Sequence, residues 1–109
     1  MRLRHRQPWT LGVLTTRSFL ALLPMTVRFT DFGGREKVAT PTGSLDNTGA
    51  AGLDPEAGDL FSYLPWGNIG FFYDGRDTGY STSLTKLGHT LDLDQLTHLE
   101  GDVTIAIVS

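Results

Sequence analysis

Residues 58–75, GDLFSYLPWGNIGFFYDG, decide the fold because they predict two strands that meet at a tight corner. Residues 59–64 alternate, with Leu and Ser side chains on one face and Asp and aromatic side chains on the other, and period two is typical of a strand. Residues 69–73 alternate in the same way, but Gly70 interrupts them, which indicates a bulge or a close approach of other atoms. The stretch holds six of the eleven aromatic residues.

The corner between the two predicted strands has the composition of a turn. Pro65 cannot donate a ladder hydrogen bond, so it ends the first strand. Gly67 and Asn68 tolerate the backbone angles that a tight corner needs. Asp74 and Gly75 then close the second strand as another turn.

Shorter patterns surround this stretch on both sides. The residue periods and breakers predict several short strands and two small helices. Before the stretch, the sequence predicts a helix at 17–23 capped by Thr15 or Thr16, a hairpin of 25–31 with 36–40, and a long loop at 41–57. After it, the sequence predicts a polar loop at 74–83, a strand at 84–87 ended by Gly88, a second helix, and a last strand at 102–108. The second helix is capped by Asp92 or Thr90, carries Leu93, Leu96 and Leu99 on one side, and ends at Gly101.

Length and composition favour one small β domain. A chain of 109 residues can bury a single core, and thirteen glycines among short aromatic strands suit a mostly β fold. Closing a sheet removes its exposed edges, so we expect a small closed or partly open β-barrel with two short helices. The absence of cysteine excludes disulfides and is compatible with a cytoplasmic protein.

Charge is distributed unevenly along the chain. Residues 1–30 hold five arginines and no acid, whereas the remainder holds four basic and twelve acidic residues. The basic start is either an arm for nucleic acid or anionic lipid, or a solvated leader. We favour the leader, because the rest of the chain would repel phosphate. We therefore expect no nucleic-acid and no membrane partner.

The first residues lack the features of a targeting segment. Polar residues between 10 and 18 break the apolar run that a signal peptide needs, and no small-residue cleavage site follows. No apolar run reaches the ~18 residues of a membrane span. We divide the chain into a variable basic leader, 1–14, with degenerate first strands as the alternative, and one domain, 15–109.

Three segments carry a resemblance to a known family. GDLFSYLPWGNIGFFY, YSTSLTKLG and GDVTIAIV, in this order, resemble bacterial cyclophilin-like fold proteins, which occur alone or joined to flavodoxins. The early segment FLALLPMTVRFTDFGGREKVA fits the helix and hairpin of that family, so the resemblance covers residues 19–108. It implies a cyclophilin-like β-barrel.

The resemblance does not extend to the residues of prolyl isomerase catalysis. Residues 67–73 are similar to the Gly-Ser-Gln-Phe-Phe strand of cyclophilins, but Gly70 stands at the position of the glutamine, and the chain has no Phe-His-Arg triplet. The family also opens with two strands before the helix, whereas residues 1–14 alternate only weakly. We expect an open sheet edge that could pair with a second copy as a homodimer.

The candidate ligand-binding residues gather around the predicted corner. They are Tyr63, Trp66, Asn68, Phe72, Tyr73 and Tyr80. The alternative is that most of these rings are core, and since Phe72 faces opposite to Phe71 and Tyr73, at most one of the two sets should be buried. Trp66 is the best surface candidate, because its indole N–H needs a partner. Asn68 has the alternative role of satisfying the backbone of the corner.

Catalytic and metal-binding signals are weak. Arg76 is a weak candidate donor to a prolyl nitrogen, and a solvated loop charge is the alternative for it and for Lys86. His89 and His98 have no partner at metal-ligand spacing, so we expect no metal. No phosphate-binding or dinucleotide-binding loop is present, so we expect no cofactor.

Three functions remain open at this point. The first is a non-catalytic binding domain that holds a peptide or small ligand in an aromatic groove. The second is a peptidyl-prolyl isomerase with a non-standard donor. The third, which only the resemblance implies, is an accessory domain to a flavodoxin-type redox protein.

Overall fold

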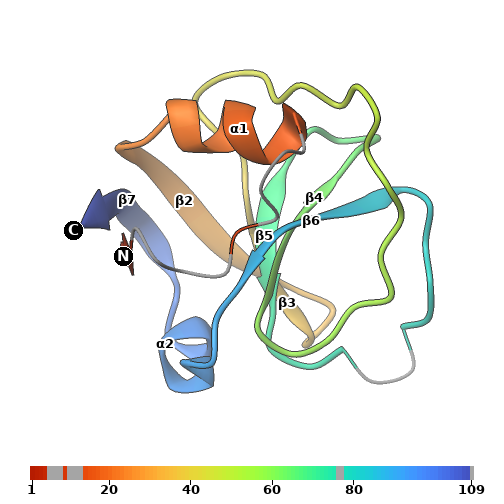
Figure 1. Cartoon of the computed structure of the whole chain (residues 1–109). Coiled ribbons are helices and arrows are strands. Elements are labelled where there is room, and N and C mark those ends of the chain that lie inside the picture. Colours follow the sequence, from red (N-terminus) through yellow and green to blue (C-terminus); the bar gives the residue numbers. More distant parts are fainter. Residues whose placement is uncertain (5–8, 10–13, 76–77, 109) are drawn as a thin grey trace.

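The fold is one curled β-sheet with a short helix near each end of it (Figure 1). The computed structural model describes residues 1–4, 9, 14–75 and 78–108. Its elements, in chain order, are β1 (Arg2–Arg4), α1 (Leu14–Ala21), β2 (Met25–Phe32), β3 (Glu36–Ala39), β4 (Asp59–Tyr63), β5 (Ile69–Phe72), β6 (Leu84–His89), α2 (Leu93–Thr97) and β7 (Gly101–Val108).

The strands follow the order β1-β7-β2-β3-β5-β4-β6, and all neighbouring pairs except the parallel pair β1–β7 are antiparallel. An isolated bridge between Trp9 and Gly88 brings the segment after β1 to β6, the strand at the other end of this order. The predicted class, a mostly β and partly open barrel with two short helices, is confirmed. The predicted homodimer through an open edge stays a prediction.

Part of the predicted leader belongs to the sheet. Residues 2–4 form β1, which lies beside the last strand, so the two ends of the chain meet (Figure 1). The two interpretations of residues 1–14 are a basic leader and degenerate first strands, and residues 2–4 are a strand. The rest of the leader, apart from residues 9 and 14, lies outside the described residues. No described helix is long and apolar enough to cross a membrane.

One apolar cluster fills the inside of the curled sheet. The alternation predicted for β2 is confirmed, with Met25, Val27 and Phe29 buried and the residues between them exposed. Phe19 of α1 packs on the same cluster, so the helix covers one end of the barrel. The buried members of this cluster are Leu3, Phe19, Met25, Val27, Phe29, Ala39, Leu60, Ile69, Phe71, Leu87, Leu96, Leu99 and Ile105.

A second, smaller cluster lies on the outer face of the sheet. Phe61, Phe72 and Leu84 pack there with Leu53, whose segment reaches the sheet through a bridge to Ser81. The strand β5 is therefore buried on both faces, and Phe71 and Phe72 are 1% and 2% exposed. The expectation that at most one set of rings would be buried was wrong, because loops cover the outer face here.

Gly70 makes the outer cluster possible. A Cβ atom at this position would lie 2.6 Å from the carbonyl oxygen of Lys37 and 2.7 Å from the ring of Phe61. The close approach predicted from the glycine is confirmed, and the ring of Phe61 occupies the space that a side chain at residue 70 would need.

Several predicted boundaries were wrong for local reasons. The first helix begins at Leu14 and ends at Ala21, so Thr15 and Thr16 lie within it, fully buried, instead of capping it. Gly88 does not end β6, because the strand continues to His89, which pairs with Asp59.

The second helix keeps its predicted start but is shorter than expected. The Asp92 side chain accepts a hydrogen bond from the backbone N–H of Gln95, which confirms the predicted cap. Leu93 is 40% exposed rather than part of the buried side formed by Leu96 and Leu99. Gly101, with a φ of 66°, begins β7 after the chain has left the helix.

Candidate functional site

The corner between β4 and β5 presents an aromatic ring to solvent on a well-bonded turn. Trp66 is 63% exposed. The backbone N–H groups of Trp66 and Gly67 both donate to the carbonyl of Tyr63, at 3.1 and 3.0 Å. The Oδ1 atom of Asn68 accepts a 3.0 Å hydrogen bond from the N–H of Tyr63. The alternative role of Asn68, which is to satisfy the corner backbone, is thus the one that these contacts show.

Trp66 forms one wall of an aromatic pocket on the outer face of the sheet. Its ring lies nearly perpendicular to those of Phe32 and Tyr63, with centroid distances of 5.7 and 5.0 Å. Phe72 also lines the pocket, from β5. The pocket has a volume of about 290 Å³, and its lining residues are Phe32, Glu36, Tyr63, Trp66, Asn68, Phe72, Thr78, Ser81 and Leu84.

One ionisable carboxyl group belongs to this pocket. Glu36 pairs with Phe32 of β2 on one side and with Phe72 of β5 on the other, and such neighbours share one face of a sheet. Burial first, and then the nearby charge of Asp31, raise the pKa of Glu36 to about 7. Among the side chains that the structure describes, none forms an ion pair with it. The aromatic pocket thus has a weakly acidic group in its wall.

Sequence reasoning missed Phe32 and Glu36. The predicted strand stopped at Asp31, one residue too early. The signal that could have found Phe32 is its parity: it continues the outward row of Thr26, Arg28 and Thr30. An aromatic side chain in an otherwise polar outward row points to a partner or a site on that face.

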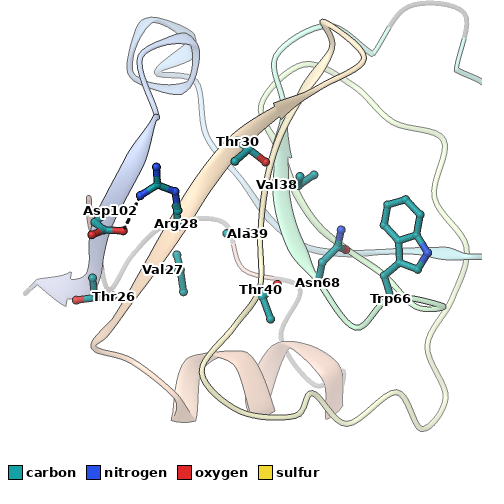
Figure 2. A pocket seen from close by; sticks show the side chains of 10 residues that line it. All are labelled: Thr26, Val27, Arg28, Thr30, Val38, Ala39, Thr40, Trp66, Asn68 and Asp102. Carbon is teal, nitrogen blue, oxygen red and sulfur yellow. Dashed lines mark ion pairs between the residues drawn. The ribbon is translucent and has the colours of Figure 1, made fainter.

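A second, larger hollow adjoins the pocket and shares Trp66 and Asn68 with it. This groove has a volume of about 690 Å³ and runs over β7, β2 and β3 (Figure 2). An exposed ion pair between Arg28 and Asp102, 3.7 Å, lies at the end away from Trp66. The other lining residues are Thr26, Val27, Thr30, Val38, Ala39 and Thr40.

The groove follows from the way two strands separate. The ladder between β2 and β3 covers only the pairs from Thr30–Val38 to Phe32–Glu36. Before Thr30, β2 pairs with β7, while residues 36–39 of β3 pair with β5. Within the described part of the chain, the facing edges of β2 and β3 beyond these pairs therefore carry no ladder contacts with each other.

Two predicted site residues lie elsewhere. The hydroxyl of Tyr73 donates to Asp31, and this bond raises the pKa of Tyr73 to about 12 and lowers that of Asp31. Tyr73 lines a different hollow, beside residues 55–57. Tyr80 is exposed, and its hydroxyl lies close to Gly52. The structure thus brings together Tyr63, Trp66, Asn68 and Phe72, but neither Tyr73 nor Tyr80 lines their pocket.

The catalytic candidate Arg76 lies outside the described residues. Lys86, the other cation considered, contacts Asp59 at 3.3 Å. Asp59 is 1% exposed and also accepts hydrogen bonds from the backbone N–H of Glu56, at 2.9 Å, and shares one with His89 Nδ1, at 2.8 Å. These contacts tie β4 to β6 and to the preceding loop. The described residues include no group of three or more side chains suited to hold a metal ion.

The fold and the outer-face pocket define a small cyclophilin-like β domain, and the comparison with family models agrees. The model of the cyclophilin-like family matches residues 14–108. The chain therefore belongs to the cyclophilin-like family. Neither the comparison with curated proteins nor the comparison with solved structures gives a match.

Proposed function

We propose that this cyclophilin-like domain is a binding module that holds a peptide or small ligand in the aromatic pocket beside Trp66. The observation that carries the proposal is the exposure of Trp66 where the pocket and the groove meet. Exposed aromatic side chains on a rigid support are typical of binding sites, because they add contact area at a small cost in conformational entropy.

The adjoining groove supports an extended peptide as the ligand. The facing edges of β2 and β3 diverge there, and strand edges without ladder contacts accept a peptide through backbone hydrogen bonds. A peptide in this groove would place one side chain in the pocket, against Trp66. An apolar side chain such as proline suits the ring faces of the pocket.

The other two functions are not part of this proposal. Isomerase activity needs a donor aimed at the prolyl nitrogen, and its candidate, Arg76, lies outside the described residues. In the part of the chain that the structure describes, no feature favours the accessory role beside a flavodoxin-type protein. Both stay predictions of the sequence.

The proposal is tested by titrating the ¹⁵N-labelled protein with short proline-containing peptides and following its NMR spectrum. We expect the indole N–H of Trp66 and the amides of Val27 and Ala39 to shift together. Trp66→Ala should weaken binding by about tenfold, as expected for an aromatic anchor. Tyr80→Ala is the matched control, because Tyr80 is similarly exposed but lies outside the pocket. The proposal would be contradicted if neither the Trp66 resonance nor the groove amides shifted, or if Trp66→Ala and Tyr80→Ala lost the same affinity.

A further inference from the structure

The walls of the aromatic pocket have the arrangement of a cage. The rings of Phe32 and Tyr63 stand almost at right angles to that of Trp66, at interplanar angles of 81° and 85°. Rings placed in this way present π-faces and edges from several directions to a small occupant. The face of an aromatic ring carries partial negative charge and attracts a cation within about 6 Å of its centroid.

The acidic groups around the pocket also favour a positively charged ligand. Glu36 contributes a carboxyl group between Phe32 and Phe72, and it lies near enough to Asp31 to feel its charge. Asp31 is already occupied, because it accepts from Tyr73 and lies 3.6 Å from Lys37. Of these two acids, Glu36 in the pocket wall is therefore the one whose negative charge a ligand can balance.

We propose that the pocket takes a methylated ammonium group, an inference that rests on the proposed binding function and specifies its ligand. Methyl groups spread the positive charge and weaken its hydration, so such a cation enters an aromatic pocket at a smaller desolvation cost than a primary amine. The pocket, at about 290 Å³, has room for a group of this size. Glu36 supplies the balancing negative charge, and Trp66, Phe32 and Tyr63 supply the ring faces.

Binding of this cation is coupled to the protonation of Glu36. The cation favours the carboxylate form, whereas burial and Asp31 favour the neutral form, with a pKa of about 7. Affinity should therefore rise as the pH rises from 6 to 8. The other charged and titratable side chains on β2, β3, β4 and β5 and in the segments that flank β3 and β5 are Arg28, Asp31, Arg35, Lys37, Asp59, Tyr63, Tyr73 and Asp74.

The test compares choline with its neutral carbon isostere, 3,3-dimethyl-1-butanol, by NMR titration of the full chain at pH 8. We expect choline to bind about tenfold more tightly and to shift the indole resonance of Trp66. Glu36→Gln should remove most of this difference and the pH dependence, and leave binding of the isostere unchanged. Glu100→Gln is the matched control, since it makes the same chemical change at an exposed residue that lies outside both the pocket and the groove.

A further arm distinguishes the sources of the group. A short peptide containing trimethyllysine would add contacts in the adjoining groove, so tighter binding than choline indicates a modified protein side chain as the natural ligand. Equal affinities indicate a small molecule. Either result supports the methylated ammonium group as the occupant of the pocket.

Three results would overturn the inference. Equal binding of choline and the isostere would show that the charge is not recognised. Undiminished choline binding in Glu36→Gln would show that this carboxyl group plays no part. Binding of proline peptides without binding of choline would leave the proposed function standing and remove only the cation, whereas binding of neither would contradict both.

Discussion

The outer face of the sheet has two halves that treat charge and aromatic surface differently. In the covered half, over β4, β5 and β6, loops bury Phe61 and Phe72, and the carboxylate of Asp59 has close partners on β6 and in the preceding loop. In the open half, over β2 and β3, Trp66 is exposed and Glu36 has no ion pair with any described side chain. Side chains of the covered half thus pack and pair within the protein, whereas those of the open half are left accessible to a ligand.

The two acids show what this difference means energetically. A buried charge stabilises a fold only when its partners are in place, and Asp59 has them. Glu36 is half-buried without such partners, so folding makes its charged form less favourable. An acid kept at such a cost supports the proposed binding site, whereas an acid with satisfied contacts is explained by the fold.

The largest effect is expected for Asp59→Asn. The change leaves Lys86 and His89 beside a neutral amide and should lower the free energy of unfolding by about 3 kcal/mol. Urea denaturation at pH 7 measures it. Ligand binding by the folded fraction should be unchanged, because Asp59 does not line the aromatic pocket. A loss below about 1 kcal/mol would show that the contacts of the covered half are not structural.

An effect of opposite sign is expected for Glu36→Gln. Because the pKa of Glu36 is raised from 4.5 to about 7 on folding, the folded state binds more protons between these values, and the stability that this group contributes falls as the pH rises through 7. Allowing for solvent screening, Glu36→Gln should be about 1–2 kcal/mol more stable than the parent at pH 8 and nearly equal to it at pH 4.5. Denaturation curves at both pH values measure the difference. A constant gap would contradict the unpaired state of this acid.

Strand patterns were predictable because they depend on neighbours in sequence. The inward row of β2, the corner at residues 64–68 and the close approach at Gly70 all follow from local period and residue type. Burial of Phe72 was not predictable in this way, since a loop that starts more than fifteen residues earlier covers it through Leu53. Likewise, residue parity places Phe32 outward but cannot place it beside Trp66, which lies in the turn between β4 and β5, and β5 is two strands away from β2 in the sheet.

The smallest effect on stability is expected for Trp66→Ala, and this result sharpens the comparison most. The ring is 63% exposed, and its ring contacts are those with Phe32 and Tyr63 among the described residues, so the free energy of unfolding should fall by about 1 kcal/mol or less. A side chain of this size that adds so little to folding fits the proposed role of Trp66 in binding. Calorimetric or urea unfolding of the variant, beside its loss of ligand affinity, separates the two roles. A fall of about 3 kcal/mol would instead make Trp66 part of the structural half, and the open half would then lose its main wall.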